Sequence, residues 1–136
     1  KFNNNSDGIA VYQGEDFIIA GIDDTEKDIS DKQLAELKKI AYGPLPIIMM
    51  VHIPIATDYN YNDMKGYGEY FSLNKKTGKN AEKLVNILSD EKSKIYAIIC
   101  GHTHGYSESE YAPGRTQYVC SQGLVGFVNE ITVKGN

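Results

Sequence analysis

The chain has 136 residues, an apolar content of 41% and a formal net charge of −4 at neutral pH. This length suits a single domain, and the apolar content is sufficient for a buried core. The acidic balance argues against the basic surface of a nucleic-acid-binding protein, and no apolar run approaches the roughly 18 residues that span a membrane. We therefore expect neither nucleic acid nor a membrane as a partner.

The two cysteines, Cys100 and Cys120, are too few for a disulfide framework. Both lie in apolar, strand-like stretches, where a small buried thiol is usual. The compartment is left open by these features. A cytoplasmic location is slightly favoured, and a secreted protein is the alternative, because the sequence begins at Lys1 rather than an initiator Met and we expect an upstream segment to be missing.

The first elements are two short β-rich stretches, "GIAVYQ" at 8–13 and "DFIIAGI" at 16–22. Gly14 and Glu15 lie between them, which predicts a hairpin.

A helix is predicted next, within "ISDKQLAELKKIAYGPLP". Ser30 followed three residues later by Gln33 has the form of a capping box, and Gly43 with Pro44 marks the end. One face of this helix is apolar and carries Leu34, Leu37 and Ala41.

The stretch "PIIMMVHIP" at 46–54 is a nearly continuous apolar run between prolines. It predicts a strand buried on both faces, as is usual in parallel sheets, and completes a βαβ unit. Residues 56–80 follow and are rich in Tyr, Asn, Asp and Gly. They predict a long loop insertion, and loops of this length are usually functional or disordered.

The last third of the chain predicts a helix within 80–93, a buried strand at 94–100, and short strands near 106–111, 116–120 and 127–133. The fold class is therefore α/β or α+β, with a mixed sheet and helices outside it, in a single domain over residues 1–136.

The three histidines of the chain follow two predicted strands. His52 ends the first buried strand, and His102 and His104 lie just past the second. Ligand sites in α/β sheets form at the carboxyl ends of strands, so we expect the three side chains to meet at one sheet edge. A hydrogen-bonded core or rim histidine is the alternative for His52 taken alone.

The motif "CGHTHG" at 100–105 places His102 and His104 two residues apart between glycines. In extended chain such residues share one face, at a spacing that suits two metal ions with one imidazole each. Gly101 and Gly105 would leave room for a metal or substrate and allow unusual φ values. Neutral imidazole suits Zn, Fe, Mn or Ni.

Together these segments resemble the calcineurin-like metallophosphoesterases, also called the metallophosphatase superfamily. The resemblance rests on "IICGHTHG" preceded by "IIMMVHIP", and on "FIIAGIDDT" followed by "DKQLAELKKI", and it covers essentially the whole chain. It implies a two-sheet β-sandwich flanked by helices. It also implies two divalent metal ions at one edge and hydrolysis of phosphomonoesters or phosphodiesters by a metal-bound hydroxide.

By motif position, the resemblance implies that His52 and His102 ligate one metal and that His104 ligates the other. Three further family elements are absent from the sequence: an early Asp-x-His, a Gly-Asp-x-x-Asp and a Gly-Asn-His-Asp/Glu. The chain therefore resembles the C-terminal portion of such a domain, with the N-terminal half missing or supplied by a partner chain. We expect no catalytic residue here beyond the metal ligands, no activity from this chain alone, and dimerisation through unpaired strand edges.

Four further residues are candidates for binding a small phosphoester substrate: Tyr59, Tyr61, Asp63 and Arg115. These two tyrosines, together with Tyr67, Tyr70 and Phe71, could stack on a base or other apolar leaving group, or they could anchor the insertion to the domain surface, which we favour. Asp63 follows His52 closely enough to face a substrate, although a solvated loop acid is the commoner interpretation. Arg115 is the only arginine and could reach a phosphate, or it could lie in an exposed turn.

Asp23 and Asp24 follow a predicted strand, and we favour an interpretation as turn or helix-entry residues over carboxylates that serve a site.

Two functions are thus compatible with the sequence. One is the C-terminal part of a binuclear metal-dependent phosphoesterase. The alternative is a non-enzymatic, degenerate relative that serves as a binding or scaffold module.

Overall fold

The computed structural model describes residues 2–5, 8–68 and 72–134, which form a mixed α/β fold on one seven-stranded sheet of order β1-β2-β3-β4-β5-β7-β6. The strands are β1 (Phe2–Asn5), β2 (Ile9–Gln13), β3 (Ile18–Ile22), β4 (Ile47–Met50), β5 (Ile95–Cys100), β6 (Ser107–Ala112) and β7 (Arg115–Val119). The helices are α1 (Asp31–Ala41), α2 (Tyr61–Met64) and α3 (Lys79–Ser89), with 3-10 turns η1 (Lys65–Tyr67) and η2 (Gly123–Val125).

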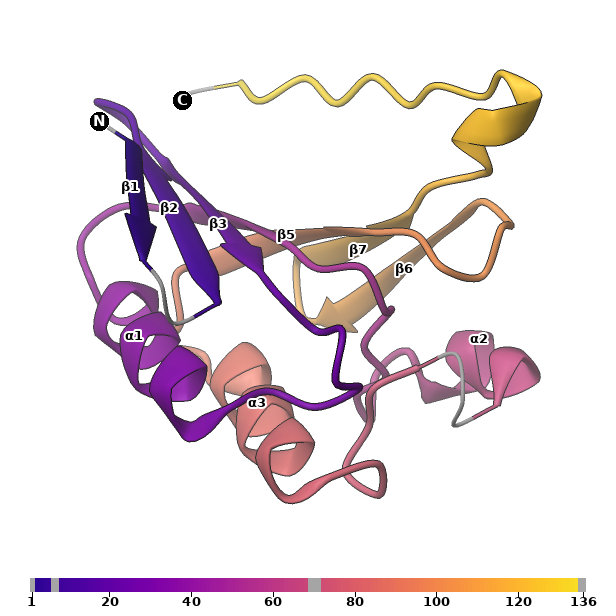
Figure 1. The fold of residues 1–136 in the computed structure, drawn as a ribbon, viewed down its shortest axis with the longest axis horizontal. Coiled ribbons are helices and arrows are strands. Elements are labelled where there is room, and N and C mark those ends of the chain that lie inside the picture. The colour runs from indigo at the N-terminus through magenta and orange to yellow at the C-terminus, as the bar shows by residue number, and fades with distance from the viewer. Residues whose placement is uncertain (1, 6–7, 69–71, 135–136) are drawn as a thin grey trace.

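The four central strands, β3, β4, β5 and β7, run parallel, and β2 and β6 pair with them antiparallel. The predicted hairpin is confirmed, because β2 and β3 pair antiparallel across the turn at Gly14. The predicted βαβ unit is also confirmed, and a second one follows through α3. Figure 1 shows α1 and α3 together on one side of the sheet.

The start of α1 is held by the predicted capping box. The Ser30 hydroxyl accepts from the Gln33 N–H at 3.2 Å, and Gln33 Oε1 accepts from the Ser30 N–H at 2.8 Å. The Gln33 amide also donates to the carbonyls of Gly8 and Asp23, at 2.8 and 2.6 Å. This one buried side chain therefore ties the helix start to the ends of β2 and β3.

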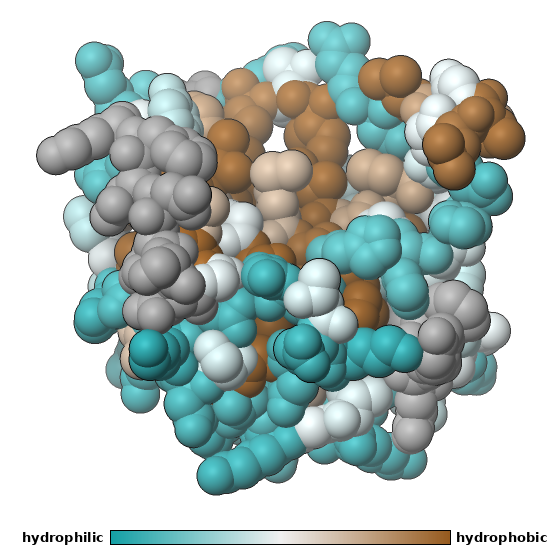
Figure 2. Space-filling model, in the orientation of Figure 1, coloured by the Kyte–Doolittle hydropathy of each residue, from teal (hydrophilic) through white to brown (hydrophobic). Residues whose placement is uncertain are grey.

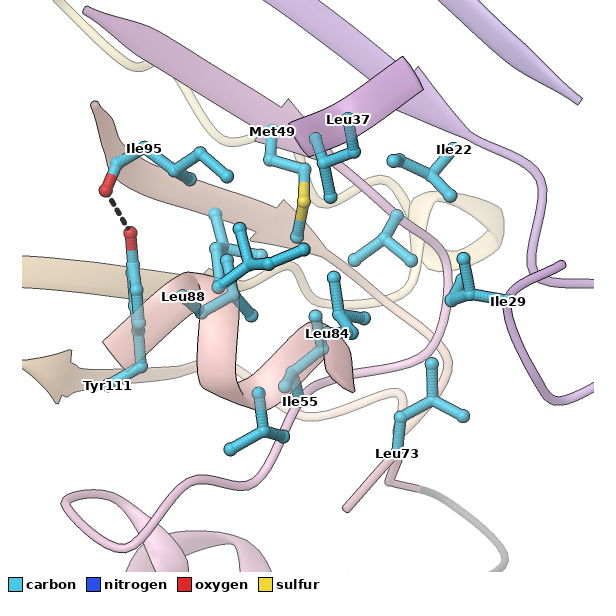
Figure 3. Packing of buried hydrophobic residues seen from close by; sticks show 14 of the residues in the cluster. Ile22, Ile29, Leu37, Met49, Ile55, Leu73, Leu84, Leu88, Ile95 and Tyr111 are labelled. Atoms are coloured by element: carbon cyan, nitrogen blue, oxygen red, sulfur yellow. Dashed lines mark hydrogen bonds between the residues drawn. The ribbon is translucent and has the colours of Figure 1, made fainter. Parts of the chain in front are cut away.

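The core lies between the two helices and the sheet. Leu37 of α1 and Leu84 and Leu88 of α3 approach Met49 of β4 in Figure 3, and all four side chains are at most 1% exposed. Burying each such side chain stabilises the fold by about 1.5–3 kcal/mol. The buried Tyr111 hydroxyl donates to the Ile95 carbonyl at 2.6 Å, so the core leaves this polar group paired.

The prediction that 46–54 forms a strand buried on both faces is wrong for this structure. In β4, Ile47 and Met49 face the helices and are fully buried, whereas Ile48 is only partly buried and Met50 is 45% exposed. The strand is apolar on both faces because its sequence is, but only one face is covered.

The strand register defines this uncovered surface, which we call the open face. Two rows of side chains cross the sheet there. They are Tyr12, Ile19, Ile48, Ala97 and Thr116, and then Ala10, Gly21, Met50, Ile99 and Tyr118. Figure 2 shows hydrophobic residues gathered in the upper centre of the view, where the surface is hollowed. Parallel sheets usually have both faces covered, whereas the described helices cover only one face of this sheet.

Residues 127–134 do not form the strand that was predicted near 127–133. Phe127 is 61% exposed and Val128 is 91% exposed. Figure 1 shows this segment extended along the side of the sheet opposite α1 and α3. Its apolar pattern is that of a strand, but no ladder pairs it with any strand of the described residues.

The insertion at 56–80 is more ordered than a plain loop, because it contains α2 and η1. Asn60 and Met64 are fully buried, and the Asn60 amide donates to the Ile55 carbonyl at 3.0 Å. Tyr70 and Phe71 lie outside the described residues.

Edge strand β6 bears on the predicted dimerisation. Its Glu108 and Glu110 are exposed. Charged side chains on an edge oppose pairing with a second copy, which makes β6 a poor dimer edge.

Within the part of the chain that the structure describes, no helix combines the length and apolar character that crossing a bilayer requires.

Met49 and Met50 are matched probes of the two faces. We predict that Met49→Ala lowers the free energy of unfolding by about 2–5 kcal/mol, because it empties a packed core site. Met50→Ala should change it by less than about 1 kcal/mol, because this side chain contacts solvent. Urea unfolding of both variants measures the difference, and equal losses would mean that the open face is in fact packed.

Candidate metal centre

His52 and His102 meet at the carboxyl edge of the parallel strands. The β4–β5 pairing continues past both strands, because the Val51 N–H donates to the Ile99 carbonyl and the Gly101 N–H donates to the His52 carbonyl, at 3.1 and 3.0 Å. The rings then lie edge to face, with His52 Nε2 3.1 Å from His102 Nδ1. The convergence predicted for these two histidines is therefore present.

The 3.1 Å separation of these nitrogens has two chemical interpretations. One is a hydrogen bond between neutral rings, with the donor set by the tautomer. The other is a shared metal ion. Two nitrogens at roughly 2.0–2.1 Å from one ion lie about 3.4 Å apart at a tetrahedral angle and about 2.9 Å apart at a right angle. The observed separation falls between these values, so the donor pair fits one ion.

The Gly-His-x-His turn is not the extended chain that was expected. His102 and His104 have φ values of 65° and 62°, and the Thr103 N–H donates to the Gly101 carbonyl at 2.7 Å, which closes a three-residue turn around His102. Left-handed backbone costs a non-glycine residue about 1–2 kcal/mol. Unusual φ values were expected at Gly101 and Gly105. They occur instead at His102 and His104.

His104 follows on the same turn and is exposed, whereas His102 is half-buried. Among the residues that the structure describes, no group of three or more His, Cys, Asp and Glu side chains is placed to hold a metal ion. The histidines therefore form a close pair with a third imidazole two residues away.

Asp24 contacts the backbone of His52, and its side chain is only 3% exposed. Its carboxylate accepts from the Ile53 N–H at 2.5 Å and from the His52 N–H at 3.3 Å. The interpretation as a turn residue is confirmed for the Asp24 backbone, because its carbonyl accepts from the Lys27 N–H at 2.9 Å, but its buried carboxylate also binds the end of β4. Asp23 is also a turn residue, which is exposed and accepts from the Thr25 hydroxyl and N–H, and these two bonds lower the pKa of Asp23.

Cys100 adjoins the motif but is buried, as predicted. Burial raises the pKa of its thiol, and the charges of Cys120 and Asp24 add to the effect. The thiol therefore stays protonated at neutral pH and is a poor metal ligand.

The insertion borders the turn through Tyr67, one of the aromatic residues expected either to stack on a leaving group or to anchor the insertion. Its hydroxyl lies 3.7 Å from the position that a β-carbon on Gly105 would take, and its ring packs against the core. Tyr59 and Tyr61 are 57% and 49% exposed, and Asp63 is also exposed, so none of these three is a buried anchor.

Arg115 does not lie at the site, which corrects its interpretation both as a phosphate ligand and as an exposed turn residue. It is 6% exposed at the start of β7, whereas the histidines follow the strand ends. Its guanidinium donates to the carbonyls of Leu88, Asp90 and Glu91 at 2.8–2.9 Å. Arg115 therefore caps the end of α3.

An open hollow of about 660 Å³ lies beside His52. It is lined by Gly8, Ile9, Ala10, Gly21, Ile22, Asp23, Met50, Val51, His52, Ile99, Cys100 and Gly101. Four of these residues belong to the open face, so the hollow joins that face to the histidine edge.

Comparison with known proteins leaves the family unassigned: no family model matches the chain, and no curated protein matches it.

Gly101 and Gly78 are matched probes of the space around the backbone. A β-carbon on Gly101 would meet no atom within 4 Å, whereas one on Gly78 would lie 2.6–2.9 Å from the Asp28 carboxylate. We predict that Gly101→Ala changes the free energy of unfolding by less than about 0.5 kcal/mol. Gly78→Ala should cost about 0.5–1.5 kcal/mol, because the Asp28 side chain has to move and give up the hydrogen bond that it accepts from the Ile29 N–H. Thermal or urea unfolding measures both, and a large loss for Gly101→Ala would contradict the open turn described here.

Proposed function

We propose that this chain is part of a binuclear metal-dependent phosphoesterase, in which His52 and His102 hold one divalent ion and His104 holds the second. The ions would be Mn, Fe, Zn or Ni, and the substrates phosphomonoesters or phosphodiesters. The observation that carries the proposal is the pair of imidazole nitrogens 3.1 Å apart at the carboxyl edge of a parallel sheet.

The chemistry follows from what each residue contributes. When bound, the ions lower the pKa of a coordinated water and neutralise charge on the phosphoryl oxygens. His52 presents Nε2 from a backbone fixed by the β4–β5 pairing, and the turn at His102 directs Nδ1 toward it. Gly101 leaves open space beside these rings, which a phosphoryl group needs in order to approach.

The open face supports a further part of the proposal. Three histidines divided between two ions leave each ion short of the three or four protein ligands that a stable site needs. A second sheet packed on the open face would cover the hollow beside His52 and reach the same edge. We therefore place the remaining ligands on such a layer, the N-terminal half of a two-sheet sandwich or a partner chain.

The substrate would enter from the histidine edge, next to the insertion at 56–80. Tyr67 borders the turn, and the exposed Tyr59, Tyr61 and Asp63 belong to the same segment. Their exposed rings and carboxylate are available to contact a leaving group, which is how this segment would select among phosphoesters.

A non-enzymatic binding or scaffold module is the second candidate. It is favoured by the absence, among the described residues, of a third acidic, thiol or imidazole ligand converging on the pair. In that case the His52–His102 contact is a hydrogen bond between the segments that follow β4 and β5.

Metal titration separates the two candidates. We predict that Zn²⁺ shifts the ring NMR signals of His52 and His102 together and saturably. His52→Ala or His102→Ala should weaken this binding by about tenfold or more, as expected on removing a ligand. His104→Ala is the matched control, because it should retain the first ion. Loss of binding in His104→Ala alone, or no saturable shift at all, would contradict the proposed ligand pair.

We also predict that the purified chain does not hydrolyse a chromogenic phosphodiester in Mn²⁺ above the rate of the metal alone, because its site lacks ligands. Mn²⁺-dependent turnover that His102→Ala abolishes would show that this chain carries a complete site.

A further inference from the structure

Asp24 is a buried charged group that the proposed reaction does not use. It follows β3 by two residues, and its side chain is 3% exposed, whereas the neighbouring Asp23 is exposed. A carboxylate removed from water is costly unless hydrogen bonds satisfy it. Here the donors are two backbone N–H groups at the end of β4.

These two donors belong to His52 and Ile53, which lie beyond the last paired residue of β4. On the β5 side, the His52 carbonyl accepts from the Gly101 N–H at 3.0 Å. On the β3 side no ladder is available, because β3 ends at Ile22 and the chain turns toward α1. The Asp24 carboxylate takes the place of a strand there, with Oδ1 3.3 Å from the His52 nitrogen and Oδ2 2.5 Å from the Ile53 nitrogen.

The backbone of His52 is therefore held from both sides. Hydrogen bonds to an ionised acceptor are about twice as strong as neutral ones. A fixed negative charge behind a histidine pair favours a cation at that pair.

We propose that Asp24 is a positioning residue that fixes the backbone of His52, and so holds its ring opposite His102 for metal binding. This inference rests on the proposed function, since the position of His52 matters to a metal only if His52 binds one. Removal of groups that orient a metal ligand typically costs 10–100-fold in affinity. Asp24 would act on the metal in this indirect way, without coordinating it.

The test compares Asp24→Asn with Asp23→Asn. The second variant removes the same charge from the neighbouring residue, whose side chain is exposed. In metal-free chain, we expect Asp24→Asn to accelerate hydrogen exchange at the Ile53 amide by about tenfold. The Val51 amide, which donates to Ile99, should keep its protection. The affinity for Zn²⁺ should fall by about tenfold or more in Asp24→Asn and stay within about twofold in Asp23→Asn.

The two readouts separate failure of this inference from failure of the proposed function. If wild-type chain binds Zn²⁺ at His52 but Asp24→Asn leaves the affinity or the Ile53 exchange unchanged, the positioning role is wrong. If exchange at Ile53 changes as expected but no Zn²⁺ binds at His52 in the wild type, the metal site itself is wrong, and with it the use assigned to Asp24.

A purely structural role would give a different result, namely equal loss of protection at Val51 and Ile53. Should Asp24→Asn fail to fold, Asp24→Glu keeps the charge and moves it by one methylene, and we expect the same local loss at Ile53 and the same fall in Zn²⁺ affinity. Failure of both variants to fold would make Asp24 a structural residue and overturn the assignment.

Discussion

The rest of the structure depends on one constraint: the parallel strands β3, β4 and β5 are apolar on both faces of the sheet, but helices cover only one face. The helix side forms a packed core around Met49, whereas Met50 on the same strand meets solvent. The open face leads into the hollow beside His52, and residues 127–134 are extended without pairing to a strand of the described chain. A partner layer would cover the open face and supply further metal ligands at the same time. The uncovered face and the small number of ligands would then have a single explanation.

The histidine edge is built by backbone interactions that reach across the chain. Pairing of β4 with β5 carries over to His52 and Gly101, and Asp24 holds the other side of His52. The result is a nitrogen pair 3.1 Å apart, a spacing that both a hydrogen bond and a shared ion accept. The left-handed backbone at His102 supports our proposal of a shared ion, because backbone strain of this kind clusters at functional sites.

Local signals predicted most of the fold, namely the β2–β3 hairpin, the capping box of α1 and the apolar strands. Other features depend on distant pairing. The strand β1 is Phe-Asn-Asn-Asn, a sequence of low β-propensity that pairs with β2, and it was not predicted. At the site, the proximity of His52 and His102 could be predicted, because both residues follow the ends of neighbouring parallel strands. The left-handed turn at His102 could not be predicted, because unusual φ values are expected at glycines such as Gly101 and Gly105. The role of Asp24 could not be predicted either, because its hydrogen-bond partners lie 28 and 29 residues away in the sequence.

The most direct test of the account is the metal content of the purified chain, measured by elemental analysis after dialysis against sub-micromolar Mn²⁺, Zn²⁺ and Fe²⁺, with the molar mass of the species determined in the same sample. We predict little retained metal, because our proposal assigns the three histidines to one side of the site and the other ligands to a layer on the open face. Two tightly held ions per monomeric chain would contradict it, since the described residues would then have to complete a binuclear centre by themselves.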